Sequence, residues 1–425
     1  MKILIQNGSL VLPDGVKKGD VLIEGGKIAA LLDSGSKVGD AEIVDAKGLL
    51  VSPGLIDLHS HLREPGFEYK ETIATGTRAA AKGGFTSVCC MANTKPVNDN
   101  AAVTELIKLK AKREGVVRVY PIGAATKGLK GEELTEMGEL QESGVVAVSD
   151  DGRSIVDANR MRLVLTYAAH FNLPVVTHPE DLNLTNNGAM NEGYWSTVLG
   201  LSGITRAAEE TIIARDCHLA ALTGARLHVA HVSTAGGADI VRLYKAKGAK
   251  ITAETTPHYL YATDDWVDGY DPSTRVNPPL RTKDDVTALI AALKDGTIDC
   301  IATDHAPHHF DDKNLEYALA STGISGFETA LGVCWTALVA PGHMTGEQLL
   351  SKMTSAPAEL FSLPGGVIAE GGVADITIID PSEEWVVDSS LFLSKGKNTP
   401  FNGKKLTGNV VRTFVGGERV YERGV

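Results

Sequence analysis

Residues 54–66 read GLIDLHSHLREPG, and this stretch decides how the rest of the chain is interpreted. An apolar run at residues 54–56 leads into two histidines, His59 and His61, which are separated by one residue. Alternate side chains of an extended strand point to the same face, so these two imidazoles project together into one site. The stretch therefore predicts a buried strand whose end offers two nitrogen ligands to a metal ion.

Seven further apolar runs follow, and segments with the apolar spacing of helices separate them. Examples of these helical segments are Glu71–Lys82, Ala158–His170, Arg206–Leu222 and Asp284–Leu293. The eight expected strands are Leu55–His61, Thr86–Asn93, Val117–Ala125, Val145–Asp151, Pro174–His178, Arg226–His231, Lys250–His258 and Asp299–Asp304. Eight β/α repeats predict an α/β fold in which the parallel strands close into a (β/α)8 TIM barrel.

An open, doubly wound parallel sheet is the alternative to the barrel. Such a sheet would carry a glycine-rich dinucleotide turn directly after an early strand. The glycine pair Gly83-Gly84 precedes an expected strand instead of following one. The closed barrel is therefore the preferred prediction.

Both ends of the chain have a different pattern from its middle. Residues 1–52 contain short alternating segments separated by turns, and the same pattern returns over residues 365–425. Such segments are typical of antiparallel strands. We expect one small β-sandwich assembled from both ends, with the barrel at residues 53–364.

The composition narrows the classes of partner. The chain has 425 residues, 43% of them hydrophobic and 22% charged, and length alone would suggest two or three domains. Its net charge of −12 argues against binding to nucleic acid or to an anionic membrane surface, so a small-molecule substrate is expected. No stretch approaches the ~20 apolar residues of a membrane span, and no signal-peptide core is present, which predicts a cytoplasmic protein.

The cysteines give no sign of a disulfide framework. They are odd in number and contain no Cys-x-x-Cys pair, which also argues against a thiolate zinc site. We expect all five to be reduced and mostly buried: Cys89, Cys90, Cys217, Cys300 and Cys334.

Polar side chains recur where the predicted strands stop. The carboxyl ends of barrel strands form the active face of such a fold. A lone histidine there is more often structural, and a lone aspartate is commonly a helix N-cap, but six on one face favour a functional site. Four imidazoles and two carboxylates suit Zn²⁺. The candidate ligands are His59, His61, Asp151, His178, His231 and Asp304, and Asn93 also follows a strand.

The remaining histidines are weaker candidates. His258 ends the seventh run and is ambiguous, whereas His305 directly follows Asp304 and is expected to point away from the cavity. Four others lie in helical, loop or mid-strand positions and are interpreted as structural: His170, His218, His228 and His343.

These residues resemble the amidohydrolase superfamily and, within it, the type I dihydroorotases, over the full length of the chain. The resemblance rests on the motifs PGLIDLHSHLREPG (53–66), MANT (91–94), SDDG (149–152), RVNPPLR (275–281) and ATDHAPH (302–308), the last followed by Lys313. The first and last motifs are highly specific, and the middle three separate relatives from one another.

The resemblance implies two Zn²⁺ ions per subunit, with the ligands already found at the predicted strand ends. His59, His61 and Asp304 would bind the more buried ion, His178 and His231 the second, and Asp151 would bridge the two together with a hydroxide. Relatives such as dihydropyrimidinase or allantoinase would use a carbamylated lysine at the bridge, but residues 148–153 (VSDDGR) contain no lysine. Sequence alone cannot orient adjacent side chains, so the choice of Asp151 over Asp150 comes from the resemblance.

The resemblance also implies a reaction, the reversible cyclisation of N-carbamoyl-L-aspartate to L-dihydroorotate in pyrimidine biosynthesis. Amide hydrolysis needs a strong nucleophile at neutral pH, and a metal-bound water whose pKa falls from ~16 toward ~7 supplies hydroxide. A metal can also polarise the amide carbonyl. Asp304 would act as general base and acid, taking the proton of the hydroxide and returning it to the ring nitrogen that leaves.

The substrate carboxylate requires a forked cation, and Arg63 lies two residues after His61, on the same strand parity. The alternative for Arg63 is a salt bridge at the rim with Glu64 or Glu68.

The resemblance assigns the remaining contacts with the substrate. Arg63, Asn93 and His308 would bind its carboxylate, and Asn277 with the backbone near Gly323 would bind its ring amide. The segment 309–326 is expected to close over the substrate.

Two rival functions remain. One is another cyclic amidohydrolase, such as an allantoinase or hydantoinase, which the missing lysine and Arg63 disfavour. The other is a non-catalytic scaffold for aspartate transcarbamoylase, which would typically lack some of the ligands retained here. The resemblance suggests a homodimer, and association with the transcarbamoylase is left undecided by the sequence.

Overall fold

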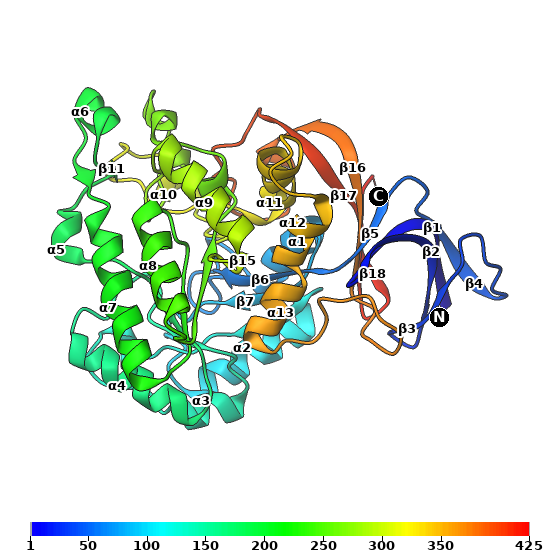
Figure 1. The fold of residues 1–425 in the computed structure, drawn as a ribbon, viewed down its shortest axis with the longest axis horizontal. Coiled ribbons are helices and arrows are strands. Elements are labelled where there is room, and N and C mark those ends of the chain that lie inside the picture. The colour runs from blue at the N-terminus through cyan, green and yellow to red at the C-terminus, as the bar shows by residue number, and fades with distance from the viewer. Residues whose placement is uncertain (1, 425) are drawn as a thin grey trace.

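The computed structural model describes residues 2–424. Eight parallel strands occupy the middle of the chain, and helices lie around them (Figure 1). The strands pair in the orders β6-β7-β8 and β15-β14-β13-β10-β9. Two parallel bridges, Gly123 with Val148 and Ser60 with His305, connect the ends of these sheets. The strands are β6 (Leu55–Ser60), β7 (Phe85–Cys90), β8 (Arg118–Pro121), β9 (Val148–Ser149), β10 (Val175–Thr177), β13 (Leu227–Val229), β14 (Ile251–Thr255) and β15 (Cys300–Ile301).

Each predicted strand of this region is present, but each is shorter than its apolar run. β6 ends at Ser60, so His59 lies on the strand and His61 lies just beyond it. β9 consists of two residues, although the run from 145 to 151 predicted a longer strand. The chain leaves the ladder early because the residues that follow turn toward a common cavity; His231 and Asp304 do so with positive φ angles of 38° and 45°.

Helices connect the strands and begin at side chains suited to cap them. Several N-cap side chains accept a hydrogen bond from a backbone N–H of the first turn, as Asp157 does from Arg160. The four helices predicted as examples are present within two residues of the expected bounds: α1 (Ile73–Lys82), α4 (Ala158–His170), α7 (Ala207–Thr223) and α9 (Lys283–Asp295). The others around the strands are α2 (Ala101–Glu114), α3 (Met137–Ser143), α8 (Ala235–Ala246), α11 (Phe327–Cys334), α12 (Gly346–Met353) and α13 (Ser355–Phe361).

The core between strands and helices is apolar and continuous. All six residues of β7 are buried, and the ring of Phe85 lies 5.5 Å from that of Phe327 on α11. This packing fixes the strand ends, which carry the polar side chains described below. Small elements outside this core were not predicted: α5 (Leu182–Thr185), β11 (Met190–Asn191), α6 (Tyr194–Leu199), β12 (Gly203–Ile204) and α10 (Phe310–Lys313).

The two ends of the chain meet in one eight-stranded sheet of order β18-β17-β16-β5-β1-β2-β3, with β4 paired to β1. Antiparallel pairing of β16 with β5 joins the C-terminal strands to the N-terminal ones. Both termini lie in this part of the molecule, to one side of the parallel strands (Figure 1). The strands are β1 (Lys2–Leu12), β2 (Gly15–Glu24), β3 (Lys27–Leu32), β4 (Ala41–Asp45), β5 (Leu50–Pro53), β16 (Ile376–Val386), β17 (Lys405–Val415) and β18 (Glu418–Glu422).

Two expectations from composition can be compared with the structure. The five cysteines are buried and form no disulfide, as predicted. None of the helices within residues 2–424 has the length and apolar character needed to cross a membrane.

Candidate metal centre

Four histidine rings converge beyond the ends of three strands. His59 and His61 come from the end of β6, His178 directly follows β10, and His231 lies two residues beyond β13. Nδ1 of His178 lies 2.8 Å from Nε2 of His231. The ring centroid of His59 lies 5.5 Å from that of His61 and 5.3 Å from that of His231. All four side chains are buried, so their nitrogen atoms face one another instead of solvent.

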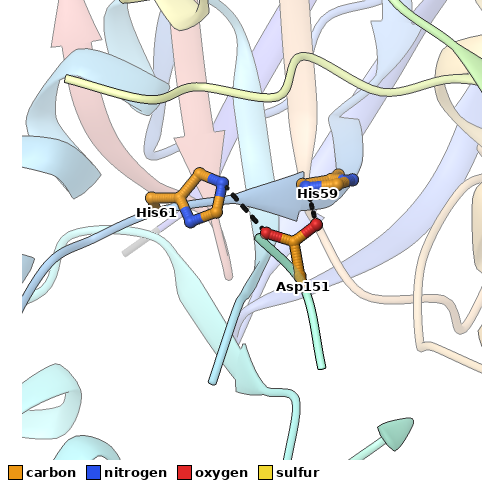
Figure 2. A group of neighbouring side chains, drawn as sticks. All are labelled: His59, His61 and Asp151. Atoms are coloured by element: carbon orange, nitrogen blue, oxygen red, sulfur yellow. Dashed lines mark ion pairs between the residues drawn. The ribbon is translucent and has the colours of Figure 1, made fainter. Parts of the chain in front are cut away.

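Asp151 lies between these imidazoles, and Figure 2 shows its two oxygens directed at His59 and His61. The oxygens lie 3.3 Å from Nε2 of His59 and 3.5 Å from Nε2 of His61. The oxygen nearer His59 also lies 3.6 Å from Nδ1 of His178 and 3.9 Å from Nε2 of His231. One carboxylate is therefore central to all four rings.

Asp150 turns away from this cluster. Its Oδ1 accepts a hydrogen bond of 2.9 Å from the backbone N–H of Thr126, and its Oδ2 accepts one from the Thr126 hydroxyl. The structure thus separates the two adjacent aspartates, which the sequence could not do: Asp150 supports a loop, and Asp151 faces the imidazoles.

Asp304 completes the set of six predicted ligands. Its Oδ1 lies 3.2 Å from Nε2 of His61 and 3.5 Å from Nε2 of His59. It follows β15, whose end is bridged to the end of β6 through Ser60 and His305. This pairing explains why two segments far apart in the sequence supply side chains to the same point.

A buried glutamate determines which nitrogen of His59 is free. Oε1 of Glu254, on β14, lies 2.7 Å from Nδ1 of His59, and Oε2 lies 3.0 Å from Nε2 of His228. A carboxylate can only accept, so Nδ1 of His59 carries the proton and donates it. Nε2 of His59 is consequently the nitrogen that faces Asp151 and that a metal ion would bind.

Two other imidazoles are oriented in the same way. Nδ1 of His61 lies 3.0 Å from Oδ1 of Asn93, and Nε2 of His178 lies 3.1 Å from Oε2 of Glu180. In each ring the outward nitrogen donates, so the inward nitrogen is the one that would bind a metal ion after losing its proton. Outer partners of this kind are usual around metal-binding histidines.

Charge within the cluster is strongly coupled. Burial alone would raise the pKa of Asp151 and of Asp304, but the imidazoles around them, His59 first, lower both below the usual range. Burial would lower the pKa of His178, yet its acidic acceptors, led by Asp151, raise it to about 10. His231 lacks such an acceptor, and burial with two neighbouring imidazoles lowers its pKa to about 3. The two carboxylates therefore remain anionic, as ligands of a cation must.

The arrangement fits a pair of metal ions. Nε2 of His59 is buried and has no hydrogen-bond partner among the described residues, as expected for a nitrogen atom that binds a metal ion. Two potential ligand groups have all their donor atoms within 4.8 Å of one another: His59, His61 and Asp151, and Asp151, His178 and His231. Because they share Asp151, this donor set of nitrogen and carboxylate oxygen suits two divalent ions with one bridging carboxylate.

Backbone strain is concentrated at this site. Arg63, His231 and Asp304 have φ angles of 61°, 38° and 45°, a region that residues other than glycine rarely adopt. Such conformations cluster at functional sites, where the surrounding structure holds them.

A cavity of about 210 Å³ opens beside the ligand cluster. Its walls include all five residues predicted to bind substrate, namely Arg63, Asn93, Asn277, His308 and Gly323, together with five of the six predicted ligands, namely His61, Asp151, His178, His231 and Asp304. The sequence-based set is therefore brought together at one place.

Arg63 turns into this cavity and makes no salt bridge at the rim. Its Nε donates to the carbonyl oxygen of Pro307 at 3.2 Å, and Nη2 lies 3.4 Å from Nε2 of His308. The two glutamates considered as alternatives have other partners: Glu64 pairs with Lys110, and Glu68 accepts from the N–H of Gly66. Burial lowers the pKa of Arg63 to about 10, so it remains a cation near neutral pH.

The two residues assigned to the ring amide differ in how free their polar groups are. Nδ2 of Asn277 donates to Glu180 at 3.1 Å, which leaves its carbonyl oxygen free. The N–H of Gly323 donates to the carbonyl of Arg275, and its own carbonyl accepts from Lys313 and Asn398. Gly323 therefore lines the cavity with both backbone polar groups already bonded.

Close approach explains the glycine at this position. Gly323 has a φ of 146°, and a Cβ there would lie 2.7 Å from the carbonyl oxygen of Ala306. A side chain would displace this wall, so glycine shapes the cavity by its size.

Three histidines outside the predicted ligand and substrate-binding sets have structural surroundings. His305 stacks on Phe327 at 4.0 Å and is not part of the cavity wall. His258 is buried against Tyr259 and is not part of the cavity wall. His228 is not an isolated core residue, because it shares Glu254 with His59.

Sequence reasoning missed the outer partners Glu254 and Glu180. A signal for the first was available, because Glu254 is the one charged residue inside the apolar strand β14 (Ile251–Thr255). Glu180 follows His178 by two residues, but only the fold shows that it reaches both that ring and Asn277.

Comparisons with known proteins assign the chain to a family. Residues 48–236 match the protein-family model described as Dihydro-orotase-like. The chain is 53% identical over 425 residues to a protein named dihydroorotase from Geobacter metallireducens, with 100% of both chains covered. A dihydroorotase from Acetivibrio thermocellus is 51% identical over 425 residues, again with 100% of both chains covered.

Among solved structures, the L-hydantoinase (dihydropyrimidinase) from Arthrobacter aurescens superimposes with a TM-score of 0.91 at 26% identity, covering 100% of this chain and 96% of that one. A D-hydantoinase superimposes with a TM-score of 0.88 at 24% identity, covering 99% and 95%, a likeness that concerns the fold alone.

Proposed function

Because the chain belongs to the dihydroorotase family, we propose that it interconverts L-dihydroorotate and N-carbamoyl-L-aspartate in pyrimidine biosynthesis. It is an enzyme of the cyclic-amide hydrolase type that acts on a small molecule. The observation that carries the proposal is one cavity lined both by the imidazole–carboxylate cluster and by the half-buried cation Arg63. Such a cavity can hold an amide at the cluster and a carboxylate at the arginine.

We propose that the cluster holds two Zn²⁺ ions per subunit. His59, His61 and Asp304 would hold one ion, His178 and His231 the other, and Asp151 both, in agreement with the two ligand groups that share Asp151. When bound, such ions supply a nucleophile at neutral pH and polarise the amide carbonyl. Glu254 and Asn93 keep the imidazoles in the tautomers that this requires.

Asp304 is proposed as the group that moves the proton. Its carboxylate lines the cavity beside Nε2 of His61, and its lowered pKa keeps it ionised. In the hydrolytic direction it would take the proton of the attacking hydroxide at a carboxylate oxygen and return it to the ring nitrogen as the C–N bond breaks. In the biosynthetic direction the same oxygen takes the proton of the ureido nitrogen.

Arg63 is proposed to bind the substrate carboxylate, with Asn93 and His308 beside it. The guanidinium offers Nη groups in a plane suited to a carboxylate, and burial in the cavity strengthens such a charged pair. Asn277 would bind the ring amide through its free carbonyl oxygen, with Gly323 forming the wall. The segment 309–326 would close over the bound substrate.

The finer architecture is also a proposal. The two bridges that link β8 to β9 and β15 to β6 support a closed (β/α)8 TIM barrel over residues 53–364. Residues 1–52 and 365–425 would form the β-sandwich domain, which their common sheet supports. We further propose that the protein is cytoplasmic and forms a homodimer. Co-purification would show whether it associates with aspartate transcarbamoylase.

The test is hydrolysis of L-dihydroorotate by the purified, zinc-loaded protein. The Asp304→Asn variant is expected to lose kcat by a factor of about 100 or more, because it removes a general acid–base group. Its bound zinc is measured by mass spectrometry, so that loss of metal is separated from loss of proton transfer. Asp239→Asn is the control, since that carboxylate is 73% exposed on α8 and does not line the cavity.

Wild-type protein that binds two zinc ions and does not turn over dihydroorotate would contradict the proposed reaction. An Asp304→Asn variant with normal kcat would leave the reaction standing and reject the role of Asp304.

A further inference from the structure

Lys313 is a buried cation that is bonded to the backbone alone. It ends α10, and its side chain is 7% exposed. Its Nζ donates to three carbonyl oxygens, those of Ser321 at 2.8 Å, Arg275 at 3.1 Å and Gly323 at 3.2 Å. An ammonium group has three N–H donors, so each one is matched to a carbonyl.

A second cation holds the same segment. Nη1 of Arg275 donates to the carbonyls of Ala320 at 2.6 Å and Tyr317 at 2.9 Å. The carbonyl of Arg275 in turn accepts from the N–H of Gly323 at 2.9 Å. Residues 317–323 are therefore tied to Arg275 by hydrogen bonds in both directions.

These bonds connect two walls of the substrate cavity. Thr322 and Gly323 line one side, and Val276 and Asn277, which directly follow Arg275, line another. Lys313 does not line this cavity itself, but it borders the adjoining one, which is lined in part by His308 and Asn398. Its Nζ bonds the carbonyl of Gly323 in one wall and that of Arg275, the residue that precedes the other.

We propose that Lys313 is a positioning residue that holds the Thr322–Gly323 wall against the Val276–Asn277 wall and so sets the affinity for substrate. Three hydrogen bonds meet at one Nζ, and together they link the backbone of Ser321 and Gly323 to that of Arg275. Without them, the carbonyls would be left unsatisfied inside the protein and the segment would shift to reach water. The inference rests on the proposed function, since it concerns the binding of the ring amide.

The first test is the kinetics of Lys313→Met on L-dihydroorotate. Methionine keeps the length of the side chain but removes every donor. KM is expected to rise by a factor of about 10 or more, while kcat and bound zinc change little, because the reacting groups are untouched. Lys313→Arg, which keeps a charged donor, should recover part of the affinity.

Lys397→Met is the matched control. Lys397 borders the same adjoining cavity and is exposed, and its Nζ bonds the carbonyl of Phe392 alone. Its KM should equal that of the wild type.

The second test follows backbone hydrogen exchange in the metal-loaded proteins. Amides of residues 317–323 should exchange faster in Lys313→Met than in the wild type or in Lys397→Met, whatever the substrate. Unchanged KM together with unchanged exchange overturns the inference, as does a change in stability without a change in KM. The wild type could also fail to turn over dihydroorotate while Lys313→Met still shows faster exchange. That result would support the positioning role of Lys313 and reject the proposed function.

Discussion

Glu254 is the residue on which the orientation of His59 depends. It is buried on β14, and each of its oxygens accepts a hydrogen bond from one imidazole, His59 or His228. His228 is held from its other side by Thr252, whose hydroxyl lies 2.8 Å from Nδ1. The hydrogen-bonded series Thr252–His228–Glu254 thus extends from the parallel strands to the metal centre.

We expect Glu254→Gln to weaken zinc binding by a factor of about 10 to 100, the usual effect of removing an outer partner. The neutral amide can accept from only one imidazole and must turn its NH₂ toward the other. The measurement is competition with a chelator of known affinity. Glu328→Gln is the control, because Glu328 is equally buried but pairs with Lys82 on the outer layer. Equal zinc affinity in wild type and Glu254→Gln would contradict the role assigned to Glu254.

Residue spacing predicted the six candidate ligands, because a histidine or aspartate at a strand end leaves a clear mark in the sequence. It could not separate Asp150 from Asp151, since their orientations depend on the bond from Thr126. Nor could it show that both polar groups of Gly323 are occupied by Arg275 and by groups such as Lys313, which are distant in the chain.

At the scale of elements, hydrophobic periodicity predicted the bounds of the long helices well, but it predicted strands that are longer than those in the structure. α4 has the predicted bounds of Ala158–His170, because its N-cap Asp157 and its apolar face agree. β9 and β15 have two residues each, because the chain turns into the site as soon as the ladder ends. The segment from α5 to β12 contains short elements that hydrophobic periodicity does not detect.

The segment that Lys313 holds should also make stability depend on pH. Burial lowers the pKa of Lys313 from 10.5 to about 7, and Arg275 adds to this while Asp271 offsets part of it. Nearby His308, with a pKa lowered to about 2 by burial and by neighbouring cations, stays neutral above that range. Between about pH 7 and pH 10 the unfolded chain therefore binds more protons at this lysine than the folded one. Stability contributed by this group must rise with pH across that window.

The check is the thermal midpoint of metal-free wild type and Lys313→Met at about pH 7 and about pH 9. The wild type should gain stability relative to the variant at the higher pH, because the cost of burying the charge is then partly relieved. Metal-free protein is used because zinc binding itself depends on pH. If the thermal midpoints of the two proteins differ by the same amount at both pH values, the lowered pKa of Lys313 is contradicted.

At the scale of the whole molecule, the N-terminal strands, the C-terminal strands and the region of the site are in contact. β16 pairs with β5, so the C-terminal strands lie against the segment that leads directly into β6 and His59. The link between β16 and β17 returns to the site, where Asn398 donates to the carbonyl of Gly323 at 2.9 Å. The alternating patterns at both ends indicated their common sheet, but this return contact depends on tertiary packing and has no signature in the sequence.

The most direct test of the account compares L-dihydroorotate with dihydrouracil, the same ring without the carboxylate, as substrates of the zinc-loaded wild type and Arg63→Ala. We expect kcat/KM of the wild type to favour dihydroorotate by a factor of about 100 or more, because an arginine that lines the cavity and is left without its anion is costly. Arg63→Ala should lose most of this preference while retaining its zinc. Wild-type turnover of dihydrouracil that equals or exceeds that of dihydroorotate would contradict the proposed function.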